Sequence, residues 1–97
     1  MSIIVASLVK YCDTADQGDI VFHAITRGLT SSATITISFS GCLTATSSFV
    51  NVAFVQLLDQ MAFDEIKNRI KIENCTQQIG EMIKKRLQFV AEQMTAA

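Results

Sequence analysis

Residues 34–49 read TITISFSGCLTATSSF, and this stretch predicts a β-strand that turns directly into an α-helix. Its first six residues alternate hydroxyl and apolar side chains, which is the two-residue period of a half-buried strand. Gly41 allows a turn, and Thr46, Ser47 and Ser48 carry side chains that cap helix N-termini. Because the first N–H groups of a helix are unpaired and attract anions, a serine here is either a cap or a site for phosphate.

The rest of the chain alternates segments of strand period with segments of helical period. We expect strands at Ser2 to Tyr11, Thr34 to Phe39 and Arg69 to Glu73, and helices at about residues 13–27, 47–61 and 76–94. Thr14 and Gln17 have the spacing of a capping box at the start of the first helix, and Gly28 is expected to end it. Gly18 inside that helix favours close packing against the sheet.

This order of elements predicts the fold class and the place of the site. A βαβαβα alternation indicates a small α/β domain with a mostly parallel or mixed sheet, since helices between strands act as right-handed crossovers. Ligands and partners of such sheets usually meet the carboxyl ends of the strands. The loop at residues 40–48 lies at that edge, so we expect the functional site there. Residues 1–97 are expected to form a single domain.

Composition excludes several classes of function. The 97 residues are 49% hydrophobic and 18% charged with a net charge of −1, which is typical of a globular chain with a buried core. A net charge so close to zero supplies no strong positive field for a nucleic-acid backbone. The apolar run from Ile3 to Val9 is far shorter than the ~20 residues that span a bilayer. We therefore expect a soluble, cytoplasmic protein that binds neither nucleic acid nor membrane.

Two segments of the chain carry a family resemblance. ITISFSGCLTATSSFVNVAFVQLL at residues 35–58, followed by RIKIENC at residues 69–75 and a closing helix, resembles the STAS-like domains of unknown function. These are small bacterial relatives of the STAS fold found in anti-sigma-factor antagonists and sulfate-transporter tails. The resemblance extends over nearly the whole chain, and it implies a STAS-like domain with a regulatory role in signal transduction.

The resemblance also implies roles for individual residues. In anti-sigma-factor antagonists, the helix after this loop begins with an Asp-Ser-Ser-Gly-type motif, whose first serine is phosphorylated by a partner kinase that is also the anti-sigma factor. By position, Ser47 corresponds to that phosphoacceptor and Ser48 lies next to it. Thr46 and Phe49 stand where the motif has its acidic residue and its glycine. A phosphate adds about −1.5 to −2 charge, which would change the electrostatic interaction with a docked partner surface.

The partner that the resemblance implies is a histidine-kinase-like ATPase or an anti-sigma-factor-like protein. The residues expected to dock it are Thr44, Thr46, Phe49, Val50 and Phe54. The outer side expected of the second helix carries Val50, Phe54 and Val55, which is more apolar surface than a solvated helix needs. Because the first strand is also expected near a sheet edge, a weak homodimer is a further expectation.

The helix start at Ser47 and Ser48 leaves other functions open. Either serine could simply cap the helix, or the helix N-terminus could bind an anion in a small-ligand or nucleotide-binding module. His23 is the only histidine, and it lies in the body of the first helix, away from the candidate nucleophiles. We therefore expect no catalytic residue, no cofactor and no enzymatic activity.

The cysteines form a separate constellation. Cys12, Cys42 and Cys75 each follow one of the expected strands, so parallel pairing would gather the three thiols near one edge of the sheet. Gathered thiolates could bind a soft metal or sense oxidation, whereas the alternative is that each is a small buried residue. No C-x-x-C pair occurs, so the sequence predicts no metal site.

Overall fold

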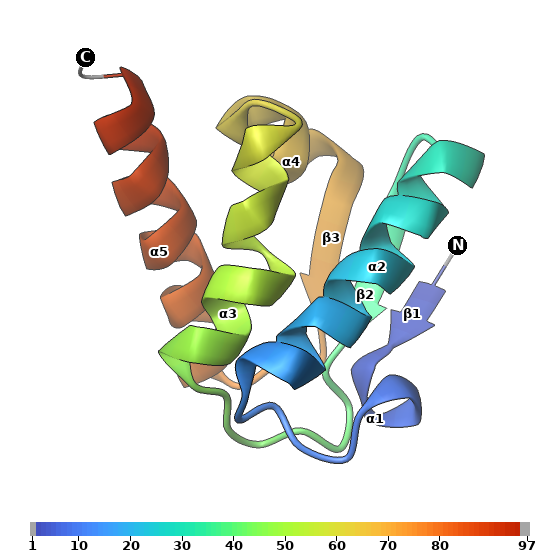
Figure 1. Ribbon diagram of the computed structural model, residues 1–97. Coiled ribbons are helices and arrows are strands. Elements are labelled where there is room, and N and C mark those ends of the chain that lie inside the picture. Colours follow the sequence, from blue (N-terminus) through green and yellow to red (C-terminus); the bar gives the residue numbers. More distant parts are fainter. Residues whose placement is uncertain (1, 96–97) are drawn as a thin grey trace.

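The computed structural model describes residues 2–95, which form an α/β fold around a three-stranded sheet (Figure 1). The strands lie in the order β1-β2-β3, and their bounds are β1 (Ser2–Ile4), β2 (Ile35–Ser38) and β3 (Ile70–Glu73). Both neighbouring pairs are parallel, with Thr36 of the central strand opposite Ser2 on one side and Lys71 on the other. The α/β class and the parallel pairing are therefore confirmed.

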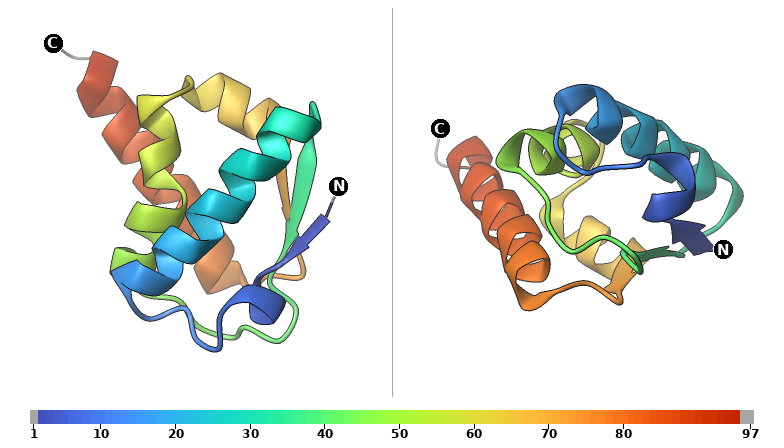
Figure 2. Two further views of the ribbon diagram at one scale, coloured as in Figure 1. Left: turned by 45° about the vertical axis from the view of Figure 1, so that its right-hand side comes forward. Right: turned by 90° about the horizontal axis from the view of Figure 1, so that it is seen from below.

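Helices fill the connections between the strands and follow the last one. Their bounds are α1 (Val5–Leu8), α2 (Ala15–Ser31), α3 (Ser47–Ala53), the 3₁₀ helix η1 (Val55–Asp59), α4 (Phe63–Arg69) and α5 (Gln77–Thr95). α2 and α3 lie side by side over one face of the sheet, and α5 packs against α3 on its other side (Figure 2). Within residues 2–95, no helix has both the length and the apolar character needed to cross a membrane.

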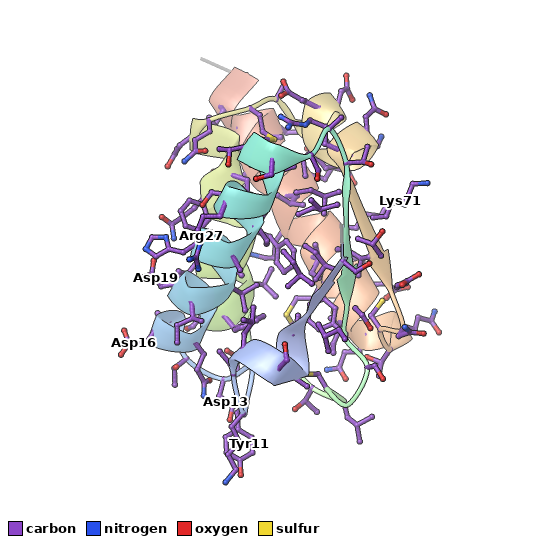
Figure 3. The ribbon with its side chains drawn as sticks, turned by 90° about the vertical axis from the view of Figure 1, so that its right-hand side faces the viewer. Tyr11, Asp13, Asp16, Asp19, Arg27 and Lys71 are labelled. Carbon is purple, nitrogen blue, oxygen red and sulfur yellow. The ribbon has the colours of Figure 1, made fainter. Side chains whose placement is uncertain are left out.

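The core lies between the inner face of the sheet and the helices. The strands bury alternate residues there, including Ile3, Ile35 and Ile37, as the period of a pleated strand requires. On the opposite face, Ile4 is 51% exposed and Lys71 points away from the helices (Figure 3). This sheet is thus open on one face, although parallel sheets are usually covered on both.

The first strand is shorter than the sequence predicts. Only its first three residues pair with β2, and the chain then enters α1, so the prediction of one strand from Ser2 to Tyr11 is wrong. The Ser7 hydroxyl donates to the Ile4 carbonyl at 2.7 Å within this turn. β1 lies at the edge of the sheet, as expected. A continuous apolar run does not by itself distinguish a strand from a buried helical turn, which explains the error.

α2 begins as predicted and ends later. Thr14 and Gln17 form both halves of the capping box. The helix continues through Gly28 to Ser31, so the expected end at residue 27 is wrong. Its last carbonyls accept hydrogen bonds from the guanidinium of Arg69, which lies forty residues further along the chain. A partner so remote in sequence gives no local signal of where the helix ends.

One continuous helix was expected from Ser47 to Met61, but the structure breaks it. α3 ends at Ala53, Phe54 leaves the helical region with φ −120° and ψ −45°, and η1 follows with a tighter pitch. Phe54 and Leu57 are both buried at the break. Tertiary packing of these two side chains therefore outweighs the helical period of the sequence.

α4 lies at residues 63–69, where the sequence predicts no helix. Asp64 and Glu65 lie in its first turn, and Lys67 and Arg69 lie in its last, an arrangement that complements the helix dipole. Ile66 is the only buried residue of this helix. With so few buried positions, the helix leaves almost no apolar period in the sequence.

Candidate functional site

Two loops meet at the carboxyl edge of the sheet, where they run together below the strands in Figure 1. The first joins β1 to α2 and includes α1, and the second joins β2 to α3. The Thr46 N–H donates to the Cys12 carbonyl at 3.0 Å, so a main-chain hydrogen bond holds the two loops together. In parallel α/β sheets, this edge is the usual place for a ligand or partner.

Gly41 determines the path of the second loop. The Cys42 N–H donates to the Phe39 carbonyl at 2.8 Å and closes a four-residue turn, in which Gly41 has a φ of 87°. A positive φ at the third residue of such a turn favours glycine. At the end of β3, the Asn74 amide donates to the Ser38 hydroxyl at 3.1 Å, so the ends of the two strands are also tied.

Thr46 is the residue that caps α3. Its hydroxyl oxygen accepts a hydrogen bond from the Phe49 N–H at 3.2 Å, and the hydroxyl donates to the Asp13 carbonyl at 2.7 Å. Ser47 and Ser48 are the first two residues of the helix, and both are exposed. Over residues 2–95, neither serine hydroxyl takes part in a hydrogen bond. Thr46 therefore serves as the helix cap, and the hydroxyls of both serines remain accessible.

Two large apolar side chains project from the same pair of loops. Leu43 is 75% exposed and Tyr11 is 56% exposed. Tyr11 extends from the end of the molecule in Figure 3, and the Lys10 ammonium lies 5.5 Å from the centre of its ring. Neither Tyr11 nor Leu43 is among the docking residues expected from the sequence, although Leu43, an apolar residue inside a hydroxyl-rich loop, is a visible signal. We define the loop edge as the exposed residues Tyr11, Leu43, Thr44, Ser47 and Ser48.

Three residues expected to dock a partner lie in the core instead. Phe49 and Val50 are completely buried, and Phe54 is almost so. The expectation that the second helix exposes Val50 and Phe54 is therefore wrong. The physical reason is that α3 lies between α2 and α5 and packs against both, so its apolar stripe has no free side. Of the expected docking residues, Thr44 and Thr46 are exposed.

Two of the three thiols meet beneath the loop edge. The Cys12 S–H donates to the Cys42 sulfur over 3.6 Å, and both side chains are buried. Burial, and then this hydrogen bond, raise the pKa of the Cys12 thiol to about 12. Cys75 instead lines a hollow between β3 and α5. In the described part of the chain, no three His, Cys, Asp or Glu side chains are grouped to hold a metal ion.

Three hollows on the surface lie away from the helix start at Ser47. One of about 400 Å³ lies between α4, β3 and α5, with Lys67 and Lys84 among its lining residues. Two others, of about 410 and 370 Å³, lie beside the C-terminal half of α5 and beside β1. Neither Ser47 nor Ser48 lines any of these three hollows, so none of the three supports the alternative of a small-ligand or nucleotide-binding module at that helix start.

A protein-family model described as a STAS-like domain of unknown function matches residues 17–79, which is more than half of the chain. The match begins in α2 and ends in α5, so it includes the Gly41 turn, the Thr46 cap and both serines. The first loop, with Tyr11 and Cys12, lies outside the matched range. No curated protein and no solved structure matches the chain.

Proposed function

The chain belongs to the family of STAS-like domains of unknown function, and we propose that it is a non-enzymatic regulatory domain that binds a protein partner at its loop edge. The resemblance to anti-sigma-factor antagonists supports a partner of the histidine-kinase-like ATPase or anti-sigma-factor-like class. The proposed setting is signal transduction in the bacterial cytoplasm, a compartment that keeps thiols such as these reduced.

One observation carries the proposal: Thr46, and not Ser47 or Ser48, caps α3. Two exposed hydroxyls therefore remain at a helix start, where a kinase could reach them. They share the loop edge with Leu43 and Tyr11, and exposed apolar side chains of this size favour contact with another protein. We propose Ser47 as the phosphoacceptor, with Ser48 as the neighbouring candidate.

The physical chemistry of this position suits a switch. A phosphate on Ser47 would add about −1.5 to −2 charge at the N-terminal end of α3, where unpaired N–H groups tolerate negative charge. The domain would therefore stay folded. A partner surface in contact with Leu43 and Ser47 would have to accommodate the new charge and its hydration, so partner binding would weaken.

The arrangement of titratable groups supports a binding role over catalysis. His23 lies on the exposed side of α2, with its Nε2 atom 3.5 Å from the Asp19 carboxylate. General-base catalysis by histidine requires a nucleophile within hydrogen-bonding reach. Within residues 2–95 the Thr26 hydroxyl donates to the His23 main-chain carbonyl at 3.0 Å, and the imidazole ring itself has no hydrogen bond to a serine, threonine or cysteine side chain.

Affinity capture with matched surface variants tests the binding role. The bait is the wild-type protein, Leu43→Ser in the loop edge, or Phe89→Ser, which removes a similarly exposed apolar side chain from α5. We expect Phe89→Ser to retain the partner of the wild type and Leu43→Ser to lose it. The captured protein is then purified and its complex reconstituted, so that binding is measured directly. Equal binding by the wild type and Leu43→Ser would remove the loop edge from the proposal.

Incubation of that purified partner with this protein and ATP tests the switch. Intact-mass measurement should show one added phosphate, and peptide mapping should place it on Ser47 or Ser48. The Ser47→Ala and Ser48→Ala variants identify the acceptor. If a histidine-kinase-like partner binds and no phosphate is added, the phosphoswitch is wrong while the binding role stands.

A further inference from the structure

We infer that Cys12 and Cys42 form a site for an intramolecular disulfide that a peroxide installs. Their sulfur atoms lie 3.6 Å apart, although the residues are 30 positions apart in the chain. A disulfide bond is about 2.05 Å long, so the sulfurs must approach by about 1.5 Å. Neither residue lies in a helix or a strand, so only loop segments need to move.

The main chain already holds the two thiols close together. The Cys12 carbonyl accepts a hydrogen bond from the Thr46 N–H at 3.0 Å, and the Cys42 N–H donates to the Phe39 carbonyl at 2.8 Å. Cys12 and Cys42 are 2% and 8% exposed, so both side chains are already confined. Bond formation therefore loses little further conformational freedom.

The orientation of the thiols assigns their order of reaction. The Cys12 S–H donates to the Cys42 sulfur, and Cys42 is the more exposed of the two, so Cys42 meets the oxidant first. Burial raises the pKa of Cys12 to about 12, so Cys12 stays a thiol and acts in the second step.

With hydrogen peroxide as the oxidant, atoms and electrons balance in both steps of disulfide formation. The Cys42 thiolate attacks hydrogen peroxide, the O–O bond breaks, and a sulfenic acid forms together with hydroxide, which takes the proton that Cys42 released. The Cys12 sulfur then bonds to the Cys42 sulfur, the S–O bond breaks, and the Cys12 proton leaves with the hydroxyl group as water. Two thiols lose two electrons and two protons, and one peroxide becomes two water molecules.

The bond would change the loop edge, and this consequence rests on the proposed function. Tyr11 immediately precedes Cys12, and Leu43 immediately follows Cys42. Drawing the two sulfurs together therefore shifts the two exposed apolar side chains relative to each other. A partner that docks on the reduced arrangement binds the oxidised domain less well. Disulfides of mesophilic cytosolic proteins are usually transient ones with catalytic or redox-sensing roles.

Treatment of the purified protein with hydrogen peroxide, followed by a thiol-alkylating reagent, tests the chemistry. We expect an intact mass lower by two hydrogen atoms before alkylation, one alkylated thiol at Cys75, and a non-reduced peptide that joins Cys12 to Cys42. Dithiothreitol should reverse the change. The crosslinked protein should unfold at a higher urea concentration than the reduced protein, because the bond restricts the unfolded chain.

Cysteine variants sharpen this test. Cys75→Ser should form the same crosslink, and Cys42→Ser should not. If Cys42→Ser fails to fold, peptide mapping of the wild type and of Cys75→Ser still decides the pairing. A crosslink to Cys75, a crosslink between two molecules, or no crosslink at all would overturn the inference.

Partner binding by the reduced and the oxidised Cys75→Ser protein tests the regulatory consequence, with the purified partner from the capture experiment as probe. We expect oxidation to weaken binding by about fivefold or more, the usual lower end of coupling between two sites. Equal binding overturns the redox regulation. If the reduced protein also binds nothing, the proposed function fails, whereas the crosslink measured by mass still stands.

Discussion

Thr46, Ser47 and Ser48 are adjacent and chemically alike, yet only Thr46 caps α3. Its backbone is extended, with φ −98° and ψ 163°, and this places its hydroxyl over the N–H of Phe49. Ser47 and Ser48 already belong to the helix, so their side chains turn outward. The distinction decides which residues are available to a partner. The sequence alone does not show which of the three residues is the cap, because helix boundaries are uncertain by one or two residues.

The raised pKa of Cys12 predicts that the stability of the fold depends on pH. In the unfolded chain its pKa is near the ordinary 9.0, and in the folded protein it is about 12. This contribution to stability is fully present below about pH 9 and is lost as the pH rises toward 12, because only the unfolded chain releases the proton in that interval. Urea unfolding at pH 7 and pH 10, under reducing conditions, should show a larger loss for the wild type than for Cys12→Ala.

The matched control for that measurement is Cys75→Ala, which removes a thiol outside the buried pair. It should lose as much stability between the two pH values as the wild type does. If Cys12→Ala also shows the wild-type loss, the buried Cys12 thiol is not the group responsible. Comparing each protein with itself at two pH values cancels the cost of the cavity that the alanine leaves.

The packing of α2 against α3 is the central contact between elements. A Cβ atom on Gly18 would lie 2.7 Å from the Phe49 carbonyl oxygen and 3.1 Å from the Val52 Cβ atom. The close approach expected of Gly18 is therefore present, but its partner is α3 and not the sheet. This contact also explains why Phe49 is buried, since the first turn of α3 presses directly on α2.

Gly18→Ala should therefore destabilise the fold. The added methyl group meets a backbone oxygen that cannot rotate away, so α2 and α3 must separate. We expect the free energy of unfolding to fall by about 1–3 kcal/mol, the usual cost of overpacking. The higher helix propensity of alanine, worth about 1 kcal/mol, opposes this loss only in part. Urea denaturation measures the difference.

Gly80→Ala is the control within a second helix. Its Cβ atom would lie 3.2 Å from the Cys75 sulfur, which belongs to a side chain that can rotate. The variant should remain within about 1 kcal/mol of the wild type. An equal loss for both variants would contradict the assignment of a special close contact to Gly18.

At the scale of the whole molecule, Arg69 joins the two crossover connections. Its guanidinium donates to the Leu29 carbonyl at 2.8 Å and to the Ala33 carbonyl at 2.9 Å, and it pairs with the Glu65 carboxylate at 3.3 Å. The end of α2 is thus satisfied by a residue from α4. This contact links the segment before β2 to the segment before β3.

Arg69→Lys should weaken this link. A lysine ammonium cannot reproduce the planar fork that reaches two carbonyls at once. We expect a loss of about 1–3 kcal/mol in the free energy of unfolding, since hydrogen bonds from charged donors are the stronger ones. Arg86→Lys replaces a guanidinium that, within residues 2–95, is bonded only to the Asn51 amide oxygen, so it should cost less in the same urea titration. Equal costs would contradict the bridging role of Arg69.

The weak homodimer remains a prediction, but fewer structural features support it. β1 is an edge strand, as such pairing requires, but it is only three residues long. Short edge strands are one way in which proteins limit edge-to-edge pairing. Val50 and Phe54, which were also expected to support a dimer, are buried.

The sequence by itself determined the features that depend on nearby residues. The alternation at residues 35–38 predicts β2, and the spacing of Thr14 and Gln17 predicts the cap of α2. At the start of α5, the Thr76 hydroxyl accepts the Ile79 N–H at 3.2 Å, which is the local bond that a threonine at a helix start favours. Each signal acts within about four positions along the chain, so it can be recognised without the fold. Together with the family resemblance, these signals were enough for the α/β class and for placing the loop at residues 40–48 at the carboxyl edge of the sheet.

Only the tertiary structure decided which side chains that edge presents. It buries Phe49 and Phe54, exposes Leu43 and Tyr11, and brings Cys12 to Cys42 while Cys75 lies elsewhere. Burial depends on which elements pack on both sides of a helix, and contact between loops depends on strand order. Neither side-chain burial nor contact between loops can be predicted from the spacing of neighbouring residues, because both depend on groups that lie tens of positions apart.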